Sequence, residues 1–187
     1  MTGKTKSILA LCTTLLPASL FFANVRQKPL RVVPHVDFAR YAGKWYEIAR
    51  LPNRFENSCE GEVTAEYTLR PDGSISVLNS CRRTDGTINQ AHGLARIADK
   101  SKPNSMLKVR FAPAFLSFIP QVWGDYEIIG LAPAYSYALV GDAERKYLWI
   151  LSRTPELRDS AYKELVEEAK SQGFDVSRLE ITRQLTR

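Results

Sequence analysis

The sequence predicts a mainly β protein in which about eight short strands precede one amphipathic helix and a final edge strand. Apolar and polar residues alternate in short segments, and Gly, Pro, Asp and Asn separate these segments. The apolar spacing changes to that of a helix only between residues 159 and 173. At 187 residues the chain has the length of about one domain, enough to bury a substantial core.

The amino terminus predicts export. Lys4 and Lys6 precede an apolar stretch from Ser7 to Val25, which is the layout of a secretory signal. Because this stretch is about 19 residues long, near the length of a spanning helix, an uncleaved anchor is the alternative. We therefore expect residues 1–25 to be a signal peptide or anchor, residues 26–35 an extended tether, and residues 36–187 the folded domain.

The first strand is predicted over residues 43–50, where Trp45, Glu47 and Ala49 alternate with Tyr46 and Ile48. The other strands are expected at residues 62–69, 75–81, 90–98, 106–111, 126–131, 137–141 and 147–153.

Turn-forming and helix-capping residues are expected to join and end these elements. The segment Pro71-Asp72-Gly73 predicts a tight turn, because proline presets φ and glycine accepts positive φ. Asp159 is expected to cap the helix and Gly173 to end it. Residues 179–183 predict the final edge strand.

Three sequence elements resemble the lipocalin family, and the bacterial lipocalins most closely. Gly43-Lys44-Trp45 opens the first strand, Arg153 closes the eighth, and Gly124-Asp125-Tyr126 is similar to a family signature that usually begins with threonine. The resemblance covers roughly residues 36–185. It implies an eight-stranded up-and-down antiparallel barrel, with a helical turn over residues 36–41 closing one end and the helix packed outside. A partner-binding or membrane-lying helix is the alternative.

The family resemblance also implies a contact between Arg153 and Trp45 at the closed end of the barrel. A guanidinium lying over an indole contributes roughly 1 kcal/mol, and more where water is excluded. We therefore expect Gly43, Trp45 and Arg153 to build the fold and to touch no ligand. Many bacterial lipocalins carry a lipid on a cysteine, but Leu11 makes the sequence around Cys12 a poor match to that pattern.

Cys59 and Cys81 would fall at one end of such a barrel, about four residues out of direct register. Chain curvature near residues 57–58 would be needed to bring them into bonding distance. In an exported protein we expect a disulfide. The alternative is a catalytic thiol, because a few lipocalin relatives are enzymes. His35 and His92 belong to no recognisable motif, and no metal-ligand spacing or phosphate loop occurs. We expect no enzymatic activity, no cofactor and no metal.

Alternation along the strands predicts which side chains face the interior and contact a ligand. These are Val63, Ala65, Tyr67, Val77, Ala95, Val109, Phe111, Tyr126, Ala138 and Trp149.

The segment of residues 111–123 is unusually apolar for a connection between strands. Two prolines prevent a regular element there, yet the segment is too apolar for an ordinary solvated loop. Phe115, Phe118 and Trp123 are therefore added to the ligand-binding candidates. The segment either folds into the barrel mouth as a lid or serves acyl-chain access, membrane docking or dimerisation.

The predicted function is non-covalent binding and storage or transport of an amphipathic lipid. Fatty acids or lysophospholipids, held in the periplasm or at the outer membrane, are what the resemblance implies. The alternative is an interaction protein with a filled barrel, present as a monomer or homodimer. The net charge is +6, and Lys4 and Lys6 supply two of these charges. This net charge favours binding to anionic membranes only slightly. The absence of basic runs with interleaved aromatic residues argues against nucleic-acid binding.

Overall fold

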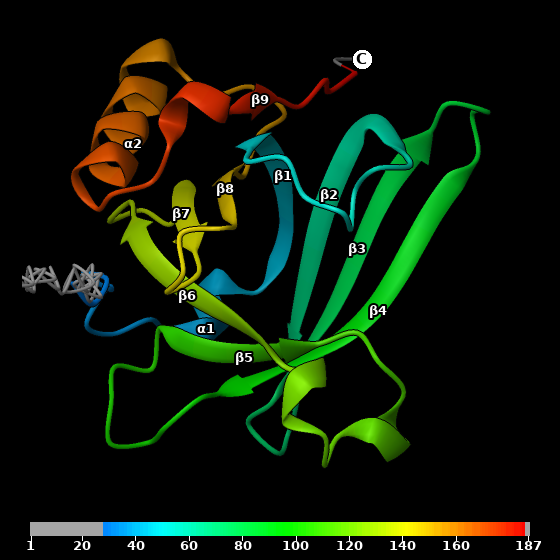
Figure 1. Ribbon diagram of the computed structural model, residues 1–187, viewed down its shortest axis with the longest axis vertical. Helices are drawn as coiled ribbons and strands as arrows, with labels where there is room; N and C mark the ends of the chain where they lie inside the picture. Colours follow the sequence, from blue (N-terminus) through cyan, green and yellow to red (C-terminus); the bar gives the residue numbers. More distant parts are fainter. Residues whose placement is uncertain (1–27, 186–187) are drawn as a thin grey trace, which may run out of the picture.

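The computed structural model describes residues 28–185. The predicted leader, with Cys12, lies outside the described residues. Eight antiparallel strands form the predicted barrel, and β1 closes it by pairing with both β2 and β8 (Figure 1). The strands are β1 (Gly43–Arg50), β2 (Cys59–Leu69), β3 (Ile75–Arg83), β4 (Ile88–Ile97), β5 (Met106–Arg110), β6 (Gly124–Leu131), β7 (Tyr137–Gly141) and β8 (Leu148–Ser152).

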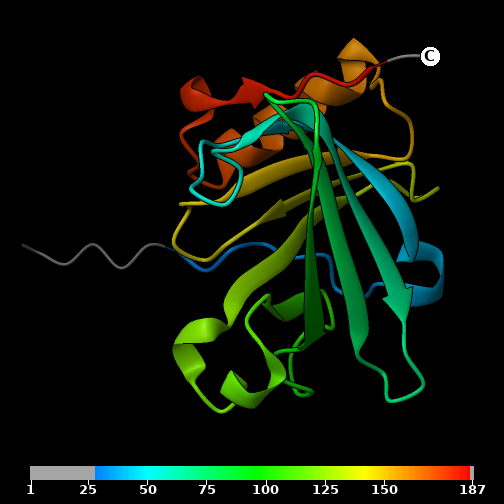
Figure 2. The ribbon, with the colours of Figure 1, turned by 90° about the vertical axis from the view of Figure 1, so that its right-hand side faces the viewer.

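The two ends of the barrel differ. The short helix α1 (Phe38–Tyr41) closes one end, where the Asp37 carboxylate accepts the Ala39 N–H at 2.9 Å. The loops after β1, β3, β5 and β7 gather at the other end, and Figure 2 shows the loop after β5 projecting there, away from α1. That loop contains the 3₁₀ turns η1 (Ala114–Leu116) and η2 (Pro120–Val122).

The predicted helix is confirmed as α2 (Asp159–Ser171), which packs on the outside of the barrel (Figure 1). Its buried face, Ala161, Leu165 and Ala169, joins outward-facing strand residues in a second hydrophobic core. Asp159 is the first helical residue and Arg158 the cap, so the predicted cap was one residue late. Gly173 ends the helix with φ +90°, as predicted. Within residues 28–185 no helix has the length and apolar character needed to cross a bilayer.

The last strand, β9 (Glu180–Ile181), is shorter than predicted and extends the edge of β1. It follows the 3₁₀ turn η3 (Val176–Arg178). Since β2 pairs with β1 only over Gly43–Tyr46, β9 takes its place beside Ala49 and Arg50. The approach is close, because a Cβ at Gly61 would lie 2.5 Å from the Arg183 carbonyl oxygen.

Residues 28–35 run extended against the barrel and contact it directly. The Val33 N–H donates to the Ile128 carbonyl at 2.9 Å, and the Arg31 N–H donates to Gln172 Oε1 at 2.8 Å. The side-chain amide of Asn104 then bonds both the N–H and the carbonyl of Val36, each at 2.8 Å. This part of the predicted tether therefore belongs to the folded unit.

Candidate functional site

The interior of the barrel contains a cavity of about 700 Å³ that opens between the loops opposite α1. Small inward residues such as Ala65, Ala91 and Ala95 leave this space unfilled. Most of the residues predicted from alternation line it: Val63, Ala65, Tyr67, Val77, Ala95, Val109, Phe111, Tyr126 and Trp149. Trp123 from the loop after β5 also borders the mouth.

Three of the predicted residues do not line the cavity. Ala138 is fully buried beneath it, because Ile128, Val140 and Leu151 fill the barrel around that position. Phe115 and Phe118 are 73% and 79% exposed, since the turns of their loop direct both rings to solvent. The prediction that they face a ligand in the barrel, as a lid would, is corrected.

Three tyrosine hydroxyls form a polar floor to the cavity. Tyr126 Oη lies 2.8 Å from Tyr41 Oη and 2.9 Å from Tyr67 Oη. Burial raises the pKa of Tyr67 to about 12, and it raises the pKa values of Tyr41 and Tyr126 well above their usual range. All three therefore stay neutral hydrogen-bonding groups. Alternation had suggested Tyr67 and Tyr126 but missed Tyr41, which comes from α1.

A buried pair of carboxyl groups forms a polar wall near the mouth. Glu47 and Glu56 both line the cavity, and Arg50 Nε lies 3.0 Å from Glu56 Oε2 and 3.6 Å from Glu47 Oε1. Burial raises the pKa of Glu47 well above its usual value, and the neighbouring Glu56 raises it further. Sequence reasoning missed this pair. The available signal was a charged Glu47 on the same strand face as Trp45 and Ala49.

Glu56 Oε2 is buried and lacks a hydrogen-bond donor of good geometry among the described residues. The raised pKa of Glu47 favours its protonated form, which can donate a hydrogen bond toward Glu56. A neutral Glu47 avoids burying two negative charges side by side.

The predicted disulfide is confirmed at the mouth, where Cys59 and Cys81 are bonded with a Cα–Cα distance of 5.6 Å. Two irregularities between Cys59 and Thr64 shift the register of β2, and Glu62 takes φ 50° there. The chain also turns at residues 57–58, as expected, because the Cys59 N–H donates to the Glu56 carbonyl at 2.8 Å. The same irregularities interrupt the alternation and explain why β2 begins before residue 62.

The predicted contact at the closed end is also confirmed. The guanidinium carbon of Arg153 lies 3.8 Å from the centre of the buried Trp45 ring. Gly43 has φ +90°, and a Cβ there would lie 3.5 Å from Arg153 Nη1. These three residues lie at the end away from the cavity mouth.

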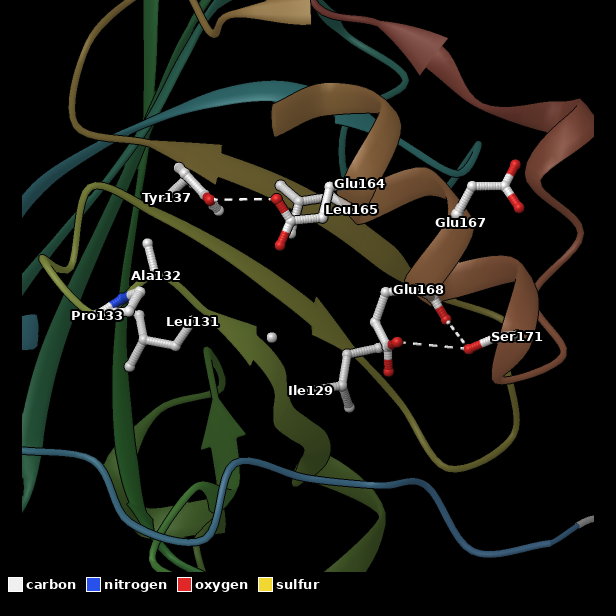
Figure 3. Close-up of a pocket in the computed structure, with 11 residues that line it drawn as sticks. Ile129, Leu131, Ala132, Pro133, Tyr137, Glu164, Leu165, Glu167, Glu168 and Ser171 are labelled. Atoms are coloured by element: carbon white, nitrogen blue, oxygen red, sulfur yellow. Dashed lines mark hydrogen bonds between the residues drawn. The ribbon is translucent and has the colours of Figure 1, made fainter. Parts of the chain in front are cut away.

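A second depression, of about 600 Å³, lies outside the barrel between α2 and the end of β6 (Figure 3). Glu164, Glu167 and Glu168 line it, and Tyr137 Oη donates to Glu164 Oε2 at 3.5 Å. The barrel cavity is the better candidate site, because larger apolar surfaces enclose it and polar groups converge at both its ends.

Comparisons with known proteins give one family. A model described as a lipocalin-like domain matches residues 36–184. Temperature-induced lipocalin-1 of Arabidopsis thaliana is 43% identical over 159 residues, 84% of each chain. Outer membrane lipoprotein Blc of Escherichia coli (strain K12) is 42% identical over 148 residues, 79% of this chain and 78% of Blc. The structure of insecticyanin from the tobacco hornworm Manduca sexta matches with a TM-score of 0.66 at 22% identity, covering 84% of this chain and 86% of insecticyanin, which shows the shared fold.

Proposed function

The chain belongs to the lipocalin family, and from this premise we propose that it binds one amphipathic lipid non-covalently inside its barrel. The observation that carries the proposal is the cavity of about 700 Å³, whose walls are apolar and whose two ends are polar. Pockets for small molecules commonly enclose 300–1,000 Å³ and combine apolar walls with a few placed polar groups.

The middle of the cavity suits an acyl chain. Val77, Val109 and Leu107 present apolar surface there, and each methylene moved from water to such a surface gains about 0.8 kcal/mol. An eight-stranded barrel has interior width for one small ligand. We therefore propose a single-chain lipid, either a fatty acid or a lysophospholipid.

The mouth suits the polar head of the lipid. Arg54 and Glu56 line it with opposite charges, and Asn79 Oδ1 is buried there without a hydrogen-bond partner among the described residues. A head group in the mouth would give this oxygen a partner. Because both signs of charge are present, the zwitterionic head of a lysophospholipid fits better than a bare carboxylate.

Two other functions have less support. The cavity speaks against an interaction protein with a filled barrel. The disulfide occupies both Cys59 and Cys81, so neither sulfur is a free thiolate for the enzyme alternative. We propose that the protein stores or transports its lipid in the cell envelope. The predicted leader and the similarity to an outer membrane lipoprotein support this location.

Displacement of a fluorescent acyl probe by lysophosphatidylcholine and by fatty acid tests the proposal. Ala91→Phe places a ring inside the cavity and should weaken probe binding tenfold or more, since it occupies the volume of the ligand. Ala134→Phe, an exposed alanine in the turn after β6, is the matched control and should bind as the parent does. Unchanged binding by Ala91→Phe would place the probe outside the barrel and contradict the proposal.

A further inference from the structure

The loop of residues 111–123, at the mouth of the barrel, exposes three large aromatic rings. Phe115 is 73% exposed, Phe118 is 79% exposed, and Phe111 is 42% exposed. All three phenylalanines belong to one short segment, which therefore presents apolar surface to solvent at several positions. Figure 2 shows the segment standing out from the barrel on the side opposite α1.

The exposed rings are held by a folded loop. Within it, the Leu116 N–H donates to the Pro113 carbonyl at 3.0 Å, and the Trp123 N–H donates to the Pro120 carbonyl at 3.1 Å. Trp123 Nε1 then donates across the loop to the Ser117 carbonyl at 2.8 Å. These bonds fix the backbone conformation of the segment. The outward position of Phe115 and Phe118 therefore follows from the fold of the loop.

Cations surround the base of the same loop. The Trp123 ring lies 4.1 Å from the guanidinium carbon of Arg96 and 5.2 Å from that of Arg110. These arginines, like Lys108, are on the outward-facing register of β4 and β5. Lys108 pairs with Asp125 at 2.5 Å, whereas neither arginine forms an ion pair with any carboxylate in residues 28–185.

Arg110 is the more buried of the two arginines, and its Nη1 donates to the Ala112 carbonyl at 2.7 Å. It is only 7% exposed, and its Nε has no hydrogen-bond partner among the described residues. A poorly hydrated cation without a counterion is costly, and a nearby anion relieves that cost. The exposed Arg96 beside it is the accessible contact for such an anion.

We propose that residues 111–123, with Arg96 and Arg110, form a docking surface for an anionic lipid bilayer. Phe115 and Phe118 enter the boundary between head groups and acyl chains, Arg96 contacts lipid phosphates, and Arg110 adds positive potential behind it. Trp123 lies at the level where an amphipathic indole is stable. Dimerisation through this face is disfavoured, because a two-fold interface would bring the arginines of both copies together.

Docking also places the cavity at the bilayer surface. Phe111, Val122 and Trp123 belong both to this loop and to the cavity lining. A lipid leaving the bilayer could therefore reach the barrel without crossing bulk water. The docking surface does not depend on the proposed function, since the side chains that contact the bilayer, Phe115, Phe118 and Arg96, lie outside the cavity lining.

Binding of the full chain to vesicles tests the proposal. Neutral phosphatidylcholine vesicles are compared with vesicles containing about one third phosphatidylglycerol, at low and at high salt. We expect at least tenfold stronger binding to the anionic vesicles, and loss of this preference at high salt. Phe115→Ser/Phe118→Ser should weaken the anionic binding tenfold or more, and Arg96→Gln should weaken it several-fold. Leu69→Ser and Arg70→Gln, near the closed end, are the matched controls and should bind as the parent does.

A local probe separates docking by this loop from contact through any other segment. Because the chain already has three tryptophans, the emission of the parent is subtracted from that of each variant. The emission that Phe118→Trp adds should be quenched by brominated phospholipid in anionic vesicles, whereas the emission that Leu69→Trp adds should not. Equal binding to neutral and anionic vesicles, parental binding by the double serine variant, or an unquenched Phe118→Trp would each overturn the proposal. Unchanged thermal melts and acyl-probe affinity of the serine variant show that its fold and cavity are intact. A dimer abolished by the same substitutions would assign the surface to a second copy instead.

Discussion

The indole nitrogen of Trp149 donates a hydrogen bond to Glu56 Oε1 over 3.0 Å and thereby joins β8 to the loop after β1. Asn53 Nδ2 donates to the same oxygen at 3.0 Å, and Arg50 Nε lies 3.0 Å from the other oxygen. A single carboxylate thus anchors one side of the mouth. The same carboxylate raises the pKa of Glu47, the buried carboxyl next to it.

We predict that Glu47 makes the fold less stable as the pH rises. Burial and Glu56 raise the pKa of Glu47 above the ordinary value of 4.5, so the folded state holds this proton more tightly than the unfolded chain does. The stability that Glu47 contributes is complete below pH 4.5 and is lost as the pH rises through the folded pKa. Glu47→Gln keeps a donor toward Glu56 without the titration, so it should lose less stability on going to alkaline pH. Urea melts of both proteins across this range measure the difference, and parallel losses would show that another group titrates.

Arg153→Ala should destabilise the fold and leave ligand affinity unchanged. The side chain lies over Trp45, and its Nη1 and Nη2 donate to the carbonyls of Lys44 and Arg40 at 2.9 and 2.7 Å. Losing these contacts should cost about 1–3 kcal/mol. Arg153→Lys keeps the charge but not the planar fork, so it should recover only part of the loss. Urea melts that coincide with those of the parent would rule out this structural role.

The disulfide should protect both cysteines of the barrel from alkylation. In a Cys12→Ser variant, labelling under denaturing, non-reducing conditions should modify no thiol, and labelling after reduction should modify Cys59 and Cys81. Replacing both with serine should lower stability by about 3 kcal/mol, as the loop-closure model gives for a loop of this size. Two labelled thiols before reduction would remove the bridge and reopen the thiol-enzyme alternative.

Tyr126→Phe should destabilise the cavity floor. The Tyr126 hydroxyl is the shared partner of Tyr41 and Tyr67, so its removal leaves two buried phenols short of a hydrogen bond, at about 1–3 kcal/mol. Tyr46→Phe, outside this cluster, is the control. In an alkaline absorbance titration of the parent, the floor tyrosines should ionise late, with Tyr67 near pH 12. Ionisation of all tyrosines in one early step would contradict the buried floor.

The barrel was predictable because local signals and the family resemblance agree. Alternation placed Val77 and Val109 inside, and the separated Trp45 and Arg153 meet as expected. Ala138 was misplaced because alternation gives a residue's face but not its depth. The Glu47–Glu56 pair depends on how a loop folds back over a strand, which periodicity does not encode.

In the loop after β5, too, the sequence pattern did not give the orientation of the side chains. Its composition indicated an unusual apolar surface, yet composition alone did not say whether the rings point inward or outward. The turns at Pro113 and Pro120 decide this, and they direct Phe115 and Phe118 to solvent. The contacts of Trp123 with Arg96 and Arg110 depend on two strands and a loop meeting, so no linear motif predicts them.

Native mass spectrometry of the delipidated protein with lysophosphatidylcholine tests the lipid-binding proposal most directly. We expect one lipid bound per chain, and we expect Ala91→Phe to lose it while Ala134→Phe keeps it, because only the first substitution fills the cavity. A parent protein that takes up no lipid, or an Ala91→Phe variant that takes up as much as the parent, would contradict binding inside the barrel.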